Sequence, residues 1–250
     1  MMEKNDNSDF LSFQLNSEII LERKDKVLRA YLSICNIPKV NLVENINVLH
    51  PSEMRYYNSL KFDNKKNNYL LGRYVAKKAI SELIAEEDYI NIVVNRGIFN
   101  QPIVTYEKYP NLQVSITHCK CMGAAIAFPE EHPMGIDVES IHVSKRLVME
   151  NQMTGSEIEL INLFSYCADK DQMLTVIWTV KEALSKVLKC GLMIPFELLE
   201  IEYIEFENGK FISTFTNFTQ YKAISFRIRD YIFSVVYPKK TRLTILKLRC

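Results

Sequence analysis

An amphipathic helix over residues 169–191 is the feature of this sequence that most constrains its fold. Apolar residues recur there at helical spacing and predict one inward face: Ile177, Val180, Leu184, Val187 and Leu188. The opposite face carries Trp178, Glu182, Ser185, Lys186 and Lys189. Gly191 suits the position just after a helix, and Pro195 lies beyond it. Glu182 and Lys186 are therefore predicted to lie one turn apart on the outward face.

A short strand that precedes this helix adds two carboxylates. Ile136 and Val138 alternate with Asp137 and Glu139. Because side chains alternate between the two faces of a strand, the carboxylates share one face while the apolar pair packs inward. Gly135 is expected to supply the turn that enters the strand.

Three carboxylates that converge on one point repel one another unless a cation lies between them. Oxygen ligands of this kind suit Mg²⁺, which usually keeps waters and takes substrate phosphates as further ligands. Asp137, Glu139 and Glu182 are thus candidate metal ligands, and Lys186 is placed to hold a phosphate oxygen. Taken singly, the patterns also fit the wet face of an edge strand and an ordinary i, i+4 ion pair worth about 0.2–0.5 kcal/mol.

The composition excludes some classes of protein and leaves others open. The chain of 250 residues has 31 basic and 30 acidic residues, so no global field favours nucleic acid or an anionic membrane. Its six cysteines have no framework spacing, no leader segment is visible, and no apolar run approaches the roughly 18 residues of a membrane span. We expect a cytoplasmic enzyme with free thiols, made of one large or two small domains.

The N-terminal half shows several further elements. Residues 1–10 are expected to be loose, and no element is assigned from there to Val48. Pro51, followed by Ser52 and Glu53, indicates a helix start. The patterns then predict a helix over 63–85, strands over 90–94 and 103–106, and a hairpin of strands 114–118 and 123–128 with His118 at its rim. Arg73 lies off the apolar stripe of its helix, so it either pairs with a carboxylate between helices or contacts a ligand.

A proline-bracketed connector follows the hairpin and predicts a division into an N-terminal lobe, 1–129, and a C-terminal lobe, 130–250. In the second lobe, Thr154 and Glu157 form a capping box that predicts a helix to about residue 164. Strands are expected from residue 199 onward, with a type I′ turn at Asn208-Gly209. Each half therefore combines helices with an antiparallel sheet, although no repeat of fixed period is visible in the sequence.

These motifs together resemble the 4′-phosphopantetheinyl transferases of the two-lobed, surfactin-synthetase-activating type. The order and spacing agree from about residue 49 to 195. The resemblance is carried by Gly135-Ile-Asp-Val-Glu139, Trp178-x-x-Lys181-Glu182-x-x-x-Lys186 with Gly191-Leu192, Ser115-Ile-Thr-His118, Leu71-Gly72-Arg73, and Gly97-x-Phe99-x-x-Pro102. It implies an α/β (α+β) pseudo-dimer of two similar lobes, each an antiparallel sheet packed with helices. Coenzyme A and Mg²⁺, or Mn²⁺ in its place, are expected between the lobes.

The resemblance also implies a reaction, in which a carrier-protein serine attacks coenzyme A and takes up phosphopantetheine, releasing adenosine 3′,5′-bisphosphate. Asp137, Glu139 and Glu182 would be metal ligands or hold metal-bound water. Lys186 would contact the phosphates or the leaving group. The base for the serine proton is either Glu182 or a water on the metal, and the sequence does not distinguish the two.

Further residues are implied to bind coenzyme A. Thr117 and His118 would hold its nucleotide end, and Arg96 its phosphates. Arg55 lies next to a basic position that such enzymes use for the nucleotide end. The family usually has Gly-Lys before the proline, whereas Asn100-Gln101 stands here, so we expect weaker binding through Gln101.

Other functions remain in view. One alternative is a binding protein that docks a carrier or nucleotide without turnover. The absence of a lysine at Gln101 favours this alternative, whereas the presence of Asp137, Glu139, Glu182 and Lys186 argues against it. A metal nuclease is opposed by the near-zero net charge. A zinc site at Cys119 and Cys121 lacks a second ligand pair of suitable spacing. The expected partner is an apo acyl or peptidyl carrier protein, with residues 164–170 as its docking segment, and the protein is expected to be a monomer.

Overall fold

Two antiparallel sheets of five strands each organise residues 12–246, the part of the chain that the computed structural model describes. The strand order of the first is β12-β1-β2-β6-β5, with bounds Arg242–Ile245, Phe13–Glu22, Val27–Asn36, Met122–Pro129 and Leu112–Cys119. The order of the second is β7-β11-β10-β9-β8, with bounds Gly135–Ser140, Tyr231–Pro238, Tyr221–Ile228, Lys210–Phe215 and Ile201–Glu207. A two-stranded ribbon, β3 (Val93–Arg96) with β4 (Pro102–Thr105), completes the pairing.

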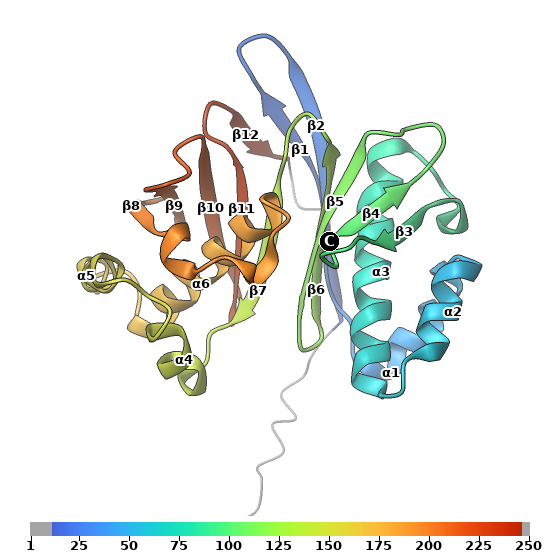
Figure 1. Ribbon diagram of the computed structural model, residues 1–250, viewed down its shortest axis with the longest axis horizontal. Helices are drawn as coiled ribbons and strands as arrows, with labels where there is room; N and C mark the ends of the chain where they lie inside the picture. The colour runs from blue at the N-terminus through green and yellow to red at the C-terminus, as the bar shows by residue number, and fades with distance from the viewer. Residues whose placement is uncertain (1–11, 247–250) are drawn as a thin grey trace, which may run out of the picture.

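Helices cover the outer face of each sheet, and the inner faces pack on each other. The helices α1 (Lys39–Leu42), α2 (Pro51–Ser59) and α3 (Asp63–Ile84) accompany the first sheet, and we call this unit the N-terminal lobe. The second sheet carries α4 (Arg146–Glu150), α5 (Gly155–Leu163) and α6 (Lys170–Val187), which form the C-terminal lobe. A third core lies between the sheets, so helix, sheet, sheet and helix follow one another across the molecule (Figure 1). The expected two-lobed α/β architecture is thus confirmed.

The two long helices form where their apolar periodicity predicts them. The helix expected over 63–85 is α3, and that expected from 169 is α6, which ends earlier than predicted. Lys189, with φ of 55°, takes the left-handed position after α6 that was expected of Gly191. Ser185, predicted on the outward face, is fully buried and donates to the Glu182 carbonyl at 2.8 Å.

Several shorter predictions are also settled. The hairpin β5–β6 and the turn at Asn208-Gly209, where both residues have positive φ, are confirmed. The strand expected over 90–94 is wrong in its first half, because the Asp88 side chain accepts from Ile90 N and caps a 3₁₀ turn at Tyr89–Asn91. Other 3₁₀ turns occur at Val43–Val48, Val143–Lys145, Gly191–Met193 and Phe196–Leu199. The expectation for residues 1–10 lies outside the described residues.

The edge strands β5 and β7 are joined by side-chain hydroxyls. Ser115 Oγ accepts from Ile136 N at 3.1 Å, and Thr117 Oγ1 accepts from Val138 N at 3.2 Å. Both hydroxyls are buried. They satisfy two N–H groups at the edge of β7 that have no partner strand on that side, and they thereby fix the lobes against each other along one line.

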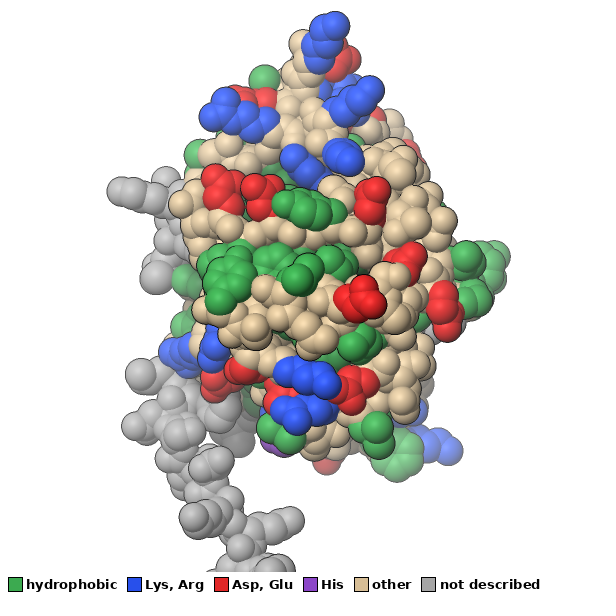
Figure 2. All heavy atoms as spheres, turned by 90° about the vertical axis from the view of Figure 1, so that its left-hand side faces the viewer, with side chains coloured by type: hydrophobic (Ala, Val, Ile, Leu, Met, Phe, Trp, Pro, Cys, Tyr) green, Lys and Arg blue, Asp and Glu red, His purple; other side chains and the backbone are tan. Residues whose placement is uncertain are grey.

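The last described strand returns to the beginning of the chain. β12 pairs with β1, with Ile19 opposite Ile245 at one end and Glu22 opposite Arg242 at the other. A C-terminal segment therefore forms the edge of the N-terminal sheet. The proposed division at residues 129 and 130 falls at the end of β6. Among residues 12–246, no helix is both long and apolar enough to cross a membrane. Figure 2 faces the outer side of the C-terminal lobe and shows hydrophobic side chains gathered across it.

Candidate active site

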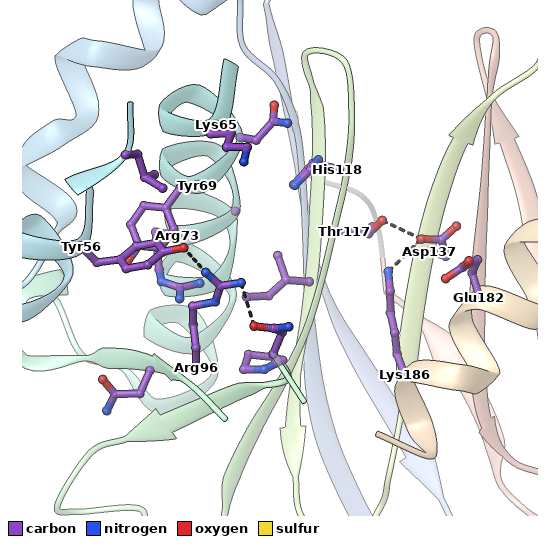
Figure 3. Close-up of a pocket in the computed structure, with 17 residues that line it drawn as sticks. Tyr56, Lys65, Tyr69, Arg73, Arg96, Thr117, His118, Asp137, Glu182 and Lys186 are labelled. Atoms are coloured by element: carbon purple, nitrogen blue, oxygen red, sulfur yellow. Dashed lines mark hydrogen bonds and ion pairs between the residues drawn. The ribbon is translucent and has the colours of Figure 1, made fainter. Parts of the chain in front are cut away.

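A cavity of about 620 Å³ lies between the lobes and is lined by both. Six residues predicted from the sequence reach it: Arg96, Thr117, His118, Asp137, Glu182 and Lys186. Figure 3 shows Asp137, Glu182 and Lys186 at one side, Thr117 and His118 in the middle, and Arg96 with further aromatic and basic side chains at the other side. One wall is therefore acidic with a single lysine, and the opposite wall is basic.

The acidic wall exists because strand β7 and helix α6 approach each other closely. A Cβ atom on Gly135 would lie 2.1 Å from the Ala183 carbonyl oxygen, so only glycine fits. This close approach, rather than the predicted turn, is the physical reason for Gly135, whose φ is not in the left-handed region. Lys186 Nζ then reaches back to β7 and donates to the Ile136 carbonyl and to Asp137 Oδ1, each at 2.8 Å.

Asp137 is the contact point between the lobes and this wall. Its Oδ1 atom accepts from Thr117 Oγ1 at 2.8 Å as well as from Lys186. The residue is only 8% exposed, yet it lines the cavity. One carboxylate oxygen therefore holds a strand of each lobe and the helix lysine together.

Glu182, the second carboxylate of this wall, has a raised pKa. Burial raises its pKa from 4.5 to about 7, and the charge of Asp137 adds to the rise more than that of Glu139, while Lys186 opposes it. A carboxylate with this pKa exchanges a proton near neutral pH. It also gains from a cation placed beside it, because the charged form is the one that its surroundings disfavour.

Glu139 shares the face of β7 with Asp137, as predicted, but its carboxylate is engaged elsewhere. Burial alone would raise its pKa, but hydrogen bonds from the Cys119 thiol, Lys145 and Ser140 N together lower it. Within the described residues, no group of three or more His, Cys, Asp or Glu side chains is arranged to hold a metal ion as it stands. Asp137 and Glu182 nevertheless suit Mg²⁺, which binds through one or two carboxylates plus substrate phosphates and waters. Glu139 would join only after leaving Cys119 and Lys145.

The basic wall comes from α2, α3 and β3, and most of it was not predicted. Arg96 stacks on the Tyr56 ring at 5.0 Å, bonds the Tyr56 hydroxyl, and donates to Asn100 Oδ1 at 3.0 Å. Arg73 stacks on Tyr69 at 4.6 Å. Lys65 completes the set. No sequence signal indicated the tyrosines, because aromatic residues near a helix stripe are usually core.

Arg73 itself resolves an alternative that the sequence left open. Its Nε lies 3.4 Å from Glu53 Oε1, a carboxylate on the neighbouring helix, and its side chain also lines the cavity. The residue is 7% exposed, and its Nε has no hydrogen-bond partner among the described residues. It therefore pairs between helices and also presents charge to the cavity.

His118 lies at the mouth of the cavity beside Thr117. Partial desolvation lowers the pKa of the imidazole, and the Lys186 charge lowers it further. A neutral imidazole at this rim has one N–H donor and one acceptor nitrogen. It is suited to a polar group at the end of a bound ligand.

Two predicted binding residues lie outside this cavity. Arg55 is exposed on α2 and is not part of its lining, whereas its neighbour Tyr56 is. Gln101 lines a second cavity of about 240 Å³, which shares Asn100, Pro102 and Lys186 with the first. The Gln101 side chain folds back on its own loop, where Oε1 accepts from Phe99 N at 2.9 Å.

One family model matches the part of the chain that carries the acidic wall. Residues 133–236 match the model of the 4′-phosphopantetheinyl transferase superfamily. That segment contains Asp137, Glu139, Glu182 and Lys186. No curated protein matches the chain.

Several solved structures were also found to be similar. One is a holo-(acyl-carrier-protein) synthase from Bacillus anthracis str. Ames in complex with CoA (3′,5′-ADP), at 18% identity and a TM-score of 0.36, covering 44% of this chain and 96% of that one. Another is the Helicobacter pylori synthase in complex with coenzyme A, at 18% identity and a TM-score of 0.32, covering 39% and 96%. The Thermotoga maritima synthase has 16% identity and a TM-score of 0.30, covering 53% and 72%.

Proposed function

We propose that this chain, whose residues 133–236 belong to the 4′-phosphopantetheinyl transferase superfamily, transfers phosphopantetheine from coenzyme A to a serine of an apo carrier protein. The observation that carries the proposal is the shape of the cavity. Asp137, Glu182 and Lys186 face a wall of arginine and tyrosine side chains across about 620 Å³, within the roughly 300–1,000 Å³ of small-molecule sites. A nucleotide with several phosphates suits the basic wall and Lys186 directly, and it would suit the two carboxylates with a cation between them.

The two cavities suggest how coenzyme A lies. Its nucleotide end fits between Arg96, Arg73 and His118, and its pyrophosphate reaches Lys186. The smaller cavity also borders Lys186 and is lined largely by amide and apolar side chains such as Gln113 and Met134, with Glu130 and Lys189 among its charged residues. The amide and apolar side chains are suited to the neutral amide chain of pantetheine.

In the proposed reaction the serine Oγ attacks the β-phosphorus, and the bond from that phosphorus to the bridging oxygen of the pyrophosphate breaks. The products are phosphopantetheinyl-serine and adenosine 3′,5′-bisphosphate. Glu182 would accept the serine proton, and its pKa of about 7 in the site without a metal ion lies near the operating pH that suits a base. Lys186 holds the phosphate whose charge increases.

Asp137 and Glu182 would hold Mg²⁺ or Mn²⁺, with Glu139 as a third ligand after rearrangement. A bound ion would supply charge stabilisation at the pyrophosphate oxygens. The chain's own contribution is to keep these side chains in place through β7, α6 and Thr117. We also propose that the protein acts as a monomer in the cytoplasm, because one chain provides both walls.

Mass spectrometry of intact carrier proteins tests the proposal. Apo acyl and peptidyl carriers are incubated with the protein, coenzyme A and Mg²⁺, with EDTA as the control. We expect one carrier or more to gain the mass of a single phosphopantetheine only when metal is present. If no carrier gains mass while coenzyme A binds by calorimetry, the protein is a non-catalytic binding homologue.

Carrier docking is proposed near residues 164–170. Tyr166 is 75% exposed and Leu163 at the end of α5 is 67% exposed, so this segment offers apolar contact next to the start of α6. Tyr166→Ala should weaken transfer to the best carrier found and leave coenzyme A binding unchanged.

Replacing Gln101 with lysine is expected to tighten coenzyme A binding a few-fold, because a charged donor bonds phosphate more strongly than a neutral one. The new ammonium would lie in the cavity that borders Lys186. Calorimetry at low and high salt measures the effect, which should shrink as salt screens the charge. Gln101→Met is the control for loss of the bond to Phe99 N. An unchanged or weaker Kd for the lysine variant would show that this loop does not face the phosphates.

The raised pKa of Glu182 predicts a pH dependence of stability. The folded-state pKa, about 7, lies above the ordinary 4.5, so ionisation of Glu182 destabilises the metal-free fold. The contribution of Glu182 to the free energy of unfolding should therefore decrease as the pH rises from about 5 to above 7, whereas the lowered pKa values of His118 and His132 act in the opposite direction below about pH 6.5. Urea denaturation in EDTA is measured across this pH range for wild type and for Glu182→Gln, and the difference between their free energies of unfolding should decrease by the contribution of Glu182. An equal pH dependence in the two proteins would rule out this contribution of Glu182.

A further inference from the structure

We propose that one buried lysine–glutamate pair in each lobe positions one wall of the cavity: Lys181 with Glu157 the acidic wall, and Lys77 with Glu53 the basic wall. The inference rests on the proposed function and assigns a role to four residues that do not line the large cavity. They are positioning residues, since each acts through a neighbour.

In the C-terminal lobe, Lys181 is fully buried on α6. Its Nζ donates to Glu157 Oε2 at 2.6 Å and to the Gln152 carbonyl at 3.2 Å. Glu157 Oε2 also accepts from Thr154 N at 2.9 Å, which closes the capping box of α5. Its Oε1 accepts from Ile201 N at 3.0 Å, at the start of β8. One carboxylate thus ties α5, α6 and β8 together.

The N-terminal lobe repeats the main contacts, and there Lys77 also donates to the Tyr89 carbonyl at 3.1 Å and Glu53 also pairs with Arg73. Lys77, fully buried on α3, lies 2.6 Å from Glu53 Oε2 and donates to the Val48 carbonyl at 2.7 Å. Glu53 Oε2 accepts from His50 N at 2.8 Å in the capping box of α2, and Oε1 accepts from Val94 N at 3.0 Å on β3. Here the carboxylate ties α2, α3 and β3 together.

The correspondence extends to the spacing along the chain. Four pairs of equivalent residues are each 104 positions apart: Val48 and Gln152, His50 and Thr154, Glu53 and Glu157, and Lys77 and Lys181. Buried ion pairs are weak evidence for added stability, because desolvation offsets their attraction. Their occurrence at the same place in both lobes therefore calls for a role in geometry.

The acidic wall depends on where α6 lies. Lys181 immediately precedes Glu182 and is five residues before Lys186. Its ion pair with Glu157 holds the face of α6 that is turned toward α5. The opposite side is fixed by the contact of Ala183 with Gly135. Between these two constraints α6 can neither rotate nor slide, so Glu182 and Lys186 stay aimed at Asp137.

The basic wall depends in the same way on α3 and β3. Lys77 lies one turn after Arg73, and Glu53 contacts both side chains. Glu53 also holds Val94, two residues before Arg96 on β3. The pair therefore sets the distance between the two arginines that face the cavity.

Paired double variants test the inference. Lys181→Met with Glu157→Gln, and Lys77→Met with Glu53→Gln, each remove both charges of the pair and keep the size of the side chains. In the N-terminal variant Arg73 also loses its ion pair with Glu53, so Lys77→Met alone, which keeps the pair of Arg73 and Glu53, is measured beside it. Circular dichroism and thermal melting check that each variant folds. Transfer kinetics and coenzyme A calorimetry are then compared with wild type, and Lys181→Arg and Lys77→Arg serve as conservative rescues.

We expect a split between the two lobes. The C-terminal variant should lose kcat by on the order of 10²-fold with the Kd for coenzyme A nearly unchanged, since misplacement of reacting groups by about 1 Å has such an effect. The N-terminal variant should raise Kd by about tenfold with kcat nearly unchanged, as expected for weakened charged hydrogen bonds. The arginine variants should remain close to wild type in both.

Two results would overturn the inference while leaving the proposed function intact. In the first, both double variants fold and have wild-type kinetics. In the second, both variants lose kcat and affinity to the same extent, and these losses follow the decrease in melting temperature. A wild-type protein that neither binds coenzyme A nor modifies a carrier would instead refute the proposed function, and the inference with it.

Discussion

Transfer of phosphopantetheine is expected to fall by at least on the order of 10²–10³-fold when Asp137 is replaced with alanine. Asp137 Oδ1 accepts from both Lys186 and Thr117, and its carboxylate is one of the two that suit Mg²⁺ as the site stands. Its removal would take away a proposed metal ligand and one of the two hydrogen bonds that hold Lys186. Turnover in saturating Mg²⁺ measures the effect, with Asp230→Ala, an exposed carboxylate outside the cavity, as the matched control.

The metal assignment depends on this result. A variant with near wild-type rate would show that Asp137 holds neither the ion nor Lys186 in a way that matters for transfer. A variant that binds coenzyme A normally and does not transfer would separate the proposed role of the acidic wall from that of the basic wall.

Replacing Gly135 with alanine is expected to destabilise the protein by about 1–3 kcal/mol or more and to reduce transfer with it. The new Cβ atom would lie 2.1 Å from the backbone oxygen of Ala183, and a backbone atom cannot turn away as a flexible side chain can. Strand β7 and helix α6 must separate, which moves Asp137 away from Lys186. Urea denaturation and transfer rates of the purified variant measure the two effects.

Gly155→Ala is the matched control for this change. Gly155 is the first residue of α5, its φ is not in the left-handed region, and a Cβ atom there meets nothing within 4 Å. Alanine should be neutral or stabilise by up to about 1 kcal/mol, because it reduces the freedom of the unfolded chain. If Gly135→Ala behaves like Gly155→Ala, the close approach of β7 and α6 does not constrain the site.

The elements that sequence predicts well are those whose pattern is local. The helices α3 and α6 show apolar residues at helical spacing, and the capping box at Thr154 and Glu157 is a contact within one turn. The hairpin β1–β2 was not assigned, although both strands are ten residues long. β2 lies inside its sheet and most of its second half is buried on both faces, so alternation is lost there and the strand resembles a mixed apolar stretch.

In the candidate site, too, the residues that were predicted are those whose pattern is local. Asp137, Glu182 and Lys186 were predicted because a strand and a helix each put charge on one face, and the structure brings the three together; their roles remain a proposal. The basic wall was largely missed because it joins α2, α3 and β3, whose contacts depend on tertiary packing. The repeat of the buried pairs was also invisible, since His50 and Thr154 cap their helices with chemically different side chains.

The pairing of β12 with β1 has a consequence for synthesis of the chain. β1 leaves the ribosome long before the strand that covers its outer edge, which includes Arg242 and Ile245. During translation the growing chain therefore carries an unpaired strand edge, which other chains can recognise as a partner. Pairing of β12 removes that hazard, so a ribosome that stalls before β12 has been made would leave a product with an exposed strand edge.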